Sequence, residues 1–184
     1  FHLGDLNFKT PQNIVEAAEK AIRDGKTGYC PNGGILPLRE ALAADINSRR
    51  NTAYTADNVS VQPGGKPVIG KFLQTVMNAG DEVLCPSPGY PIYESQIEYF
   101  GGTVLPYGFV PGKHGFVIDI ERIEKSITPK TKVLIINDFQ NPTGAACTAG
   151  EQQKLAELAK RHDLMVLLDE AYFEIHYSGK AKSI

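Results

Sequence analysis

Residues 132–144 read KVLIINDFQNPTG, and this stretch decides the fold. The apolar run over 133–136 is unbroken, which is typical of a strand whose two faces are both covered, as in a buried parallel sheet. We predict this strand over 132–137. The polar segment that follows contains Pro142 and Gly144, which end the strand and predict a loop at its carboxyl end.

Strand and helix patterns alternate on both sides of this stretch. The further predicted strands are 59–62, 82–85, 103–107 and 164–168, and the predicted helices between them are 67–79, 91–100, 120–127 and 149–162. Regular alternation with buried strands predicts an α/β fold, a three-layer αβα arrangement with a mainly parallel, doubly wound sheet.

Two helices are predicted before this alternation begins. The first spans 10–25, with Thr10 as its N-cap, Pro11 in the first helical position and Gly25 at its end; the second follows Pro37. We therefore expect residues 1–45 to form an N-terminal arm with helices, and residues 46–184 to form part of a larger α/β domain.

Composition excludes several classes of partner. The chain of 184 residues has a net charge of −2, which predicts no basic surface for nucleic acid and no polybasic membrane anchor, and no apolar run reaches membrane-spanning length. The three cysteines, Cys30, Cys85 and Cys147, form no CxxC pair, and the four histidines have no ligand spacing. These features predict a cytoplasmic protein without a metal site.

Four polar segments follow predicted strands directly. They are residues 63–66 (PGGK), 86–93 (PSPGYPIY), 138–144 (DFQNPTG) and 169–172 (DEAY). Because ligands bind outside the carboxyl ends of the strands in an open parallel sheet, we expect these segments to meet at one edge and to form the site.

Each of these segments has a functional and a structural interpretation. Two glycines before a helix can offer amides to a phosphate or can form a plain tight turn. Tyr90 can stack on a flat ring or pack in the core, Asp169 can bind a protonated ring nitrogen or cap a helix, and Asn141 can bind a ligand or form a turn. Pro67 occupies the position where a P-loop has Ser or Thr, and no GxGxxG follows a strand, so both nucleotide motifs are disfavoured.

Taken together, the motifs resemble the class I and II aminotransferases, pyridoxal-phosphate enzymes of fold type I. The matching positions, in chain order, are Tyr29, Gly33-Gly34, Leu38-Arg39, 63–66, 80–83, 86–93, 141–144 and 169–172. The resemblance implies a large-domain fold and pyridoxal 5′-phosphate as cofactor. It also implies amino-group transfer between an amino acid and a 2-oxo acid, in an enzyme that acts as a homodimer.

The resemblance assigns cofactor contacts to individual residues. Gly65 and Lys66 match the positions whose backbone amides hold the cofactor phosphate, and Tyr90 matches the aromatic residue that stacks on the pyridine ring. Asp169 matches the carboxylate paired with the pyridine nitrogen. An ionised carboxylate there keeps the nitrogen protonated, so that the ring accepts electrons.

Other matches lie around the ring and at the subunit boundary. Asn141 and Tyr172 match the hydrogen-bond partners of the cofactor's phenolic oxygen. Tyr29 matches a residue that reaches the phosphate of the neighbouring subunit, and Gly4 resembles part of a mobile loop on the substrate side. Arg39 matches a structural ion-pair residue and is not assigned to the site.

The chain departs from the family pattern in two places. Asp138-Phe139-Gln140 precedes NPTG where a Pro-Asn lead is usual. The Schiff-base lysine of the family follows the DEAY segment in a motif that does not occur here, and Lys180 and Lys182 read as solvated tail residues. We therefore expect the front part of a large domain without the C-terminal small domain, inactive when isolated. A C–S β-lyase of the same fold type and a non-catalytic α/β module remain alternative interpretations.

Overall fold

The computed structural model describes residues 7–175 and divides the chain into two compact units. The N-terminal unit runs to Ser48 and includes Thr52–Val61. The sheet unit comprises Arg49–Asn51 and the chain from Gln62 onward. Each unit is described by itself.

Helix α1 (Gln12–Arg23) begins later than the sequence predicts. Its N-cap is Pro11, whose carbonyl accepts the amides of Ile14 and Val15, and no side chain caps the helix. The prediction of Thr10 as N-cap is therefore wrong, because the first helical hydrogen bonds start one residue further along. The predicted end is confirmed, since Gly25 has φ +74° and follows the last turn.

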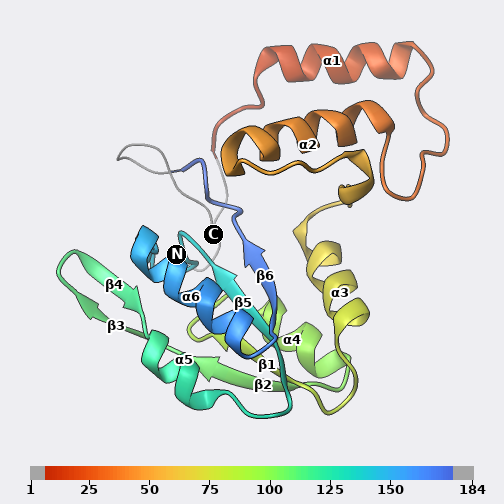
Figure 1. The fold of residues 1–184 in the computed structure, drawn as a ribbon. Coiled ribbons are helices and arrows are strands. Elements are labelled where there is room, and N and C mark those ends of the chain that lie inside the picture. The colour runs from red at the N-terminus through yellow and green to blue at the C-terminus, as the bar shows by residue number, and fades with distance from the viewer. Residues whose placement is uncertain (1–6, 176–184) are drawn as a thin grey trace. The chain divides into compact units, whose positions relative to one another are not determined.

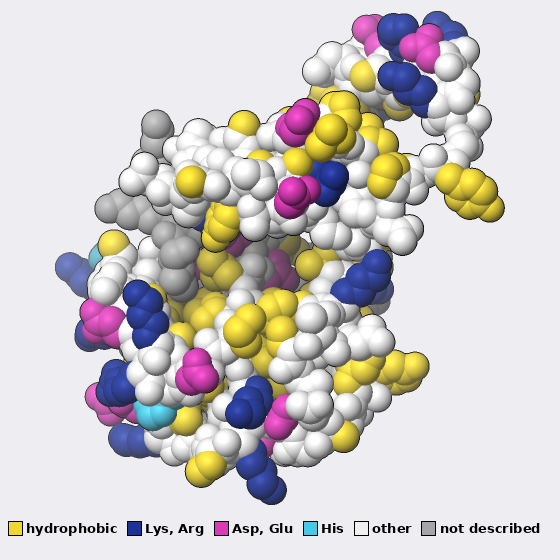
Figure 2. Space-filling view, turned by 45° about the vertical axis from the view of Figure 1, so that its right-hand side comes forward, with side chains coloured by type: hydrophobic (Ala, Val, Ile, Leu, Met, Phe, Trp, Pro, Cys, Tyr) yellow, Lys and Arg dark blue, Asp and Glu magenta, His cyan; other side chains and the backbone are white. Residues whose placement is uncertain are grey.

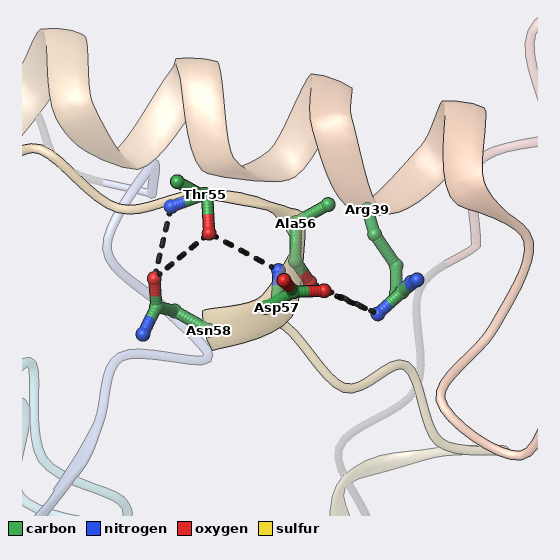
Figure 3. Close-up of polar contacts among 5 residues, drawn as sticks. All are labelled: Arg39, Thr55, Ala56, Asp57 and Asn58. Carbon is green, nitrogen blue, oxygen red and sulfur yellow. Dashed lines mark hydrogen bonds and ion pairs between the residues drawn. The ribbon is translucent and has the colours of Figure 1, made fainter.

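Helix α2 (Leu36–Arg50) belongs to the N-terminal unit as far as Ser48, and the short 3₁₀ helix η1 (Ala56–Asn58) follows it in that unit. Thr55 and Asn58 cap η1 reciprocally: the Thr55 hydroxyl accepts from the Asp57 amide, and the Asn58 side chain accepts from the Thr55 amide (Figure 3). The Arg39 guanidinium donates to the Ala56 carbonyl at 3.1 Å and lies 4.0 Å from the Asp57 carboxylate. Arg39 thus fastens α2 to η1 in a structural role.

The strand predicted over 59–62 is absent from the structure. The chain is extended there, and the Val61 amide donates to the Gly33 carbonyl at 2.9 Å, but no ladder forms. A short apolar run is compatible with a strand, yet pairing with a neighbour decides whether one forms.

The sheet unit contains a four-stranded parallel sheet. In spatial order its strands are β2 (Thr103–Tyr107), β1 (Glu82–Pro86), β5 (Thr131–Asn137) and β6 (Met165–Asp169). The run over 133–136 lies in β5, where Leu134 pairs with Leu84 of β1 and Val166 of β6. Strand β6 is at the edge of the sheet as far as the structure describes the chain.

Helices cover both faces of this sheet (Figure 1). Helices α3 (Gly65–Val76) and α4 (Ile92–Tyr99) pack on one face, where they meet Val133 and Ile135. Helices α5 (Ile120–Ser126) and α6 (Ala149–Arg161) pack on the other, against Leu134 and Ile136. Because successive residues of β5 are buried on opposite faces, the predicted three-layer αβα fold is confirmed.

An antiparallel hairpin, β3 (Phe109–Gly112) and β4 (Gly115–Ile118), was not predicted from the sequence. Its turn has none of the Asn-Gly or Asp-Gly signals, and Pro111 lies inside the first strand, which argues against a strand there.

Basic and acidic side chains are intermixed on the face shown in Figure 2, with hydrophobic side chains between them. None of the helices within residues 7–175 combines the length and apolar character needed to cross a membrane.

Candidate active site

The candidate site is built on the carboxyl ends of β5 and β6. Asn137 and Asp169, the last residues of these strands, are paired in register. The Asn137 side-chain amide donates to the Asp169 carbonyl at 3.1 Å, and the Asp138 amide donates to the same carbonyl at 3.2 Å. Two backbone loops therefore leave the sheet side by side, one carrying NPTG and the other carrying DEAY.

The Asp169 carboxylate is held by two donors. The Tyr93 hydroxyl donates to Oδ2 at 2.6 Å, and the Ala171 amide donates to Oδ1 at 3.0 Å. Tyr93 is 1% exposed, and burial, together with the bond to Asp169, raises the pKa of its hydroxyl far above the ordinary range. Tyr93 is therefore a neutral donor that fixes the direction of the carboxylate.

Tyr90 and Asn141 are connected to this carboxylate by short chains of contacts. The Tyr90 ring meets the Tyr93 ring edge-on, with centroids 5.7 Å apart. The Asn141 amide donates to Asn137 Oδ1 at 2.8 Å. Since Tyr93 and Asn137 both bond to Asp169, the structure gathers three of the predicted residues around one end of the sheet.

The polar ends of three predicted side chains are available to a ligand. No hydrogen bond joins the Asn141 side-chain amide, the Tyr90 hydroxyl or the Tyr172 hydroxyl to any other residue between 7 and 175. Tyr172 lies just beyond β6 and is 41% exposed. Glu170, two residues before Tyr172 in the chain, forms an ion pair with Arg50.

Gly65 and Lys66 are the first residues of α3. Amides in the first turn of a helix have no partner inside the helix, and Pro67 supplies no amide, so Gly65 and Lys66 carry the donors there. Gly64 precedes them with φ +99°, and a Cβ placed on either glycine would meet nothing within 4 Å. Helix-start amides with no side chain beside them at Gly64 and Gly65 suit an anion.

The described cluster does not include two of the predicted residues. Tyr29 belongs to the N-terminal unit and is completely exposed. Gly4 lies outside the described residues. No group of His, Cys, Asp and Glu side chains within 7–175 has the arrangement of a metal site.

Sequence reasoning missed the supporting residues Tyr93, Asn137 and Gln140. Tyr93 occurs three residues after Tyr90 at the start of a predicted helix, and this spacing was the available signal. The sequence pattern indicates only a strand end at Asn137 and only a departure from the family pattern at Gln140. Each also bonds to a residue far away in the sequence, Asp169 or Pro88, and local patterns do not predict such contacts.

The whole chain is similar to proteins of one family. Residues 1–184 match the family described as aminotransferase class I and II. The chain belongs to this family. It is 38% identical over 177 residues to aspartate/prephenate aminotransferase from Thermus thermophilus, covering 96% of this chain and 46% of that protein.

Solved structures of aminotransferases have the same fold. The aspartate aminotransferase of Thermus thermophilus with maleate superposes with a TM-score of 0.93 at 38% identity, over 98% of this chain and 47% of that one. Alanine aminotransferase from Pyrococcus furiosus gives a TM-score of 0.92 at 28% identity, over 97% and 45% of the two chains. The chain thus spans about half the length of the relatives that it matches.

Proposed function

We propose that this chain is the ring- and phosphate-binding part of a pyridoxal-phosphate-dependent aminotransferase, which transfers an amino group between an amino acid and a 2-oxo acid. The observation that carries the proposal is the Asp169 carboxylate, oriented by Tyr93 and the Ala171 amide at the edge shared with Asn141. When bound, the cofactor would supply an electron-accepting ring for chemistry at the amino acid's α-carbon.

The role of Asp169 is to hold a proton on a ring nitrogen. A carboxylate beside a pyridinium stabilises the protonated ring by charge and hydrogen bonding. Its two donors fix both carboxylate oxygens, so little reorientation is needed when the ring enters. Tyr90, half-buried beside Tyr93, offers an aromatic face for stacking.

Other residues would bind the phosphate and the phenolic oxygen of the cofactor. The Gly65 and Lys66 amides lie at the positive end of α3, where no side chain fills the Cβ positions of Gly64 and Gly65, and they would bind a phosphate. Asn141 and Tyr172 have polar atoms ready to bond a phenolic oxygen, since neither side chain is committed to another hydrogen bond within 7–175.

Turnover needs groups that we do not assign within this chain. No lysine here is assigned to covalent chemistry with the cofactor, so we expect binding without transamination when the 184-residue chain is tested alone.

In the whole protein we propose a homodimer in which Tyr29, fully exposed here, reaches the partner's phosphate site. Unpaired cysteines fit a cytoplasmic location. Aspartate, named in several relatives, is the first amino donor to test.

The test is a titration with pyridoxamine 5′-phosphate, whose amine does not react with surface lysines. We expect saturable binding, weakened about ten- to a hundredfold by Asp169→Asn, because a hydrogen bond between charged groups is replaced by a neutral contact. Asp163→Asn is the matched control: it makes the same change just before β6, at the opposite end of the strand, on an exposed residue. Equal affinities for the Asp169 and Asp163 variants would contradict the role of Asp169.

A second measurement addresses turnover. Borohydride reduction after pyridoxal phosphate is added should leave no cofactor attached to a defined lysine. A single reduced adduct at one lysine, found by peptide mass mapping, would overturn the expectation of binding without covalent attachment.

A further inference from the structure

Gln140 is buried between the two loops that carry Tyr90 and Asn141. It is 2% exposed, and it stands in the NPTG loop directly before Asn141. Its side-chain Nε2 donates to the Pro88 carbonyl at 2.8 Å, in the loop that leads from β1 to Tyr90. This is a bond from one site loop to the other.

All hydrogen-bonding capacity of the Gln140 amide is used. Besides Pro88, Nε2 donates to the Asn141 carbonyl. Oε1 accepts from the Thr143 amide at 2.9 Å and from its hydroxyl at 2.6 Å. A glutamine has two donors and two acceptor positions, so this buried group is fully satisfied. A satisfied buried network permits one arrangement of its partners and rigidifies it.

The NPTG loop is also fixed at its base. Asp138, 2% exposed, accepts from the Phe139 amide at 3.0 Å and the Cys147 amide at 2.9 Å. Its other oxygen accepts from Gln152 Nε2 of α6 at 3.0 Å. The loop that carries Asn141 is therefore attached to α6. The bond from Gln140 to the Pro88 carbonyl then attaches the loop that leads to Tyr90 to this fixed loop.

We propose that Gln140 is a positioning residue that ties the loop of Pro88 to the NPTG loop and so sets the spacing between Tyr90 and Asn141. This rests on the proposed function only insofar as these two residues hold a cofactor ring: one stacks on its face, and the other bonds its oxygen. The spacing itself is a property of the protein.

Gln140→Glu is the variant that removes the two bonds donated by Nε2, to Pro88 and to Asn141, and keeps an acceptor for Thr143. Glutamate keeps the length of the side chain, but it replaces the donor group by an oxygen that faces the Pro88 and Asn141 carbonyls. Gln140→Leu removes all four bonds and serves as the second variant. Gln153→Glu is the matched control, because Gln153 is exposed on α6 and donates the same kind of bond to Glu157.

Two readouts separate positioning from stability. The Gly89 nitrogen shares a peptide group with the Pro88 carbonyl, so its ¹⁵N resonance responds when that carbonyl loses its hydrogen bond. We expect Gln140→Glu to shift the Gly89 and Tyr90 amide resonances and to weaken binding of pyridoxamine 5′-phosphate about tenfold. A residue that only stabilised the NPTG loop would lower the unfolding midpoint and leave the Gly89 and Tyr90 resonances in place.

The outcomes are distinct. If the unsubstituted chain binds pyridoxamine 5′-phosphate and Gln140→Glu binds it within twofold as tightly, Gln140 does not set the ring spacing. If the unsubstituted chain binds none, the proposed function fails, and the resonances alone decide whether Gln140 joins the loops. Unshifted Gly89 and Tyr90 resonances in both Gln140 variants would overturn the proposal whatever the affinity.

Discussion

Replacing Tyr93 by phenylalanine tests the central contact of the site most directly. The substitution removes one hydroxyl and keeps the ring, which is 1% exposed and packed in the core with α3 and β5 residues. No cavity of the size of a side chain forms. The change is therefore confined to the bond that holds Asp169 Oδ2 at 2.6 Å.

The expected magnitude follows from the partners. A hydrogen bond to a charged group contributes about 1.5–3 kcal/mol to the free energy of unfolding. Asp169 is half-buried and keeps its bond from the Ala171 amide, so water can replace part of the loss, and the lower end of that range applies. We expect Tyr93→Phe to cost about 1.5–2 kcal/mol, which lowers the unfolding midpoint by roughly 3–8 °C in a chain of this size.

The assay is urea and thermal unfolding followed by circular dichroism, together with titration by pyridoxamine 5′-phosphate. Tyr107→Phe is the comparison: Tyr107 is equally buried, but its hydroxyl donates to the Ile135 carbonyl, at 2.8 Å, inside the core. Both variants should lose stability, whereas the Tyr93 variant alone should lose affinity. The reasoning is refuted if Tyr93→Phe unfolds within about 0.3 kcal/mol of the unsubstituted chain, or if both variants bind equally well.

Three further predictions concern packing and reactivity. Leu134→Ala, in the fully buried centre of β5, should cost about 3–5 kcal/mol in urea unfolding; a loss below 1 kcal/mol would argue against the central position of this strand. Gly34→Ala should destabilise the N-terminal unit by about 1–3 kcal/mol, seen as faster amide exchange there, because Gly34 has φ +96° and an added Cβ would lie 2.8 Å from the Val61 Cβ. Burial raises the pKa of the Cys85 thiol to about 12, so a thiol reagent at about pH 9 should label exposed Cys30 and leave Cys85 protected until unfolding; rapid labelling of both in the folded chain would contradict this.

The fold was largely predictable because burial on both faces leaves a signal in one stretch of sequence. The run over 133–136 is apolar at every position, and the structure places its members alternately against the two helix layers. The segment at 59–62 has a similar but weaker pattern and forms no strand, since no neighbouring strand pairs with it. The spacing of apolar residues indicates which side chains a segment can bury. Whether the segment pairs with a neighbouring strand depends on the rest of the chain.

The supporting residues of the site were less predictable. Asp169 and Asn141 stand in recognisable motifs at strand ends, where the parallel topology brings them together. Tyr93 is 76 residues away from Asp169 in sequence, and Gln140 is 52 residues away from Pro88. Neither pair has a local pattern, because the bonds form only after the strands have assembled.

The edge position of β6 has a consequence for the precision of the site. Within residues 7–175, β6 has a hydrogen-bonded neighbour, β5, along one side only, whereas β5 is held along both sides. An edge strand opens by local fraying at a lower free energy than global unfolding requires, so the alignment of the carboxylate at its end follows that local equilibrium. Any segment that paired with the outer edge of β6 would narrow the range of orientations of Asp169 without touching it, and amide exchange along β6 would record the change.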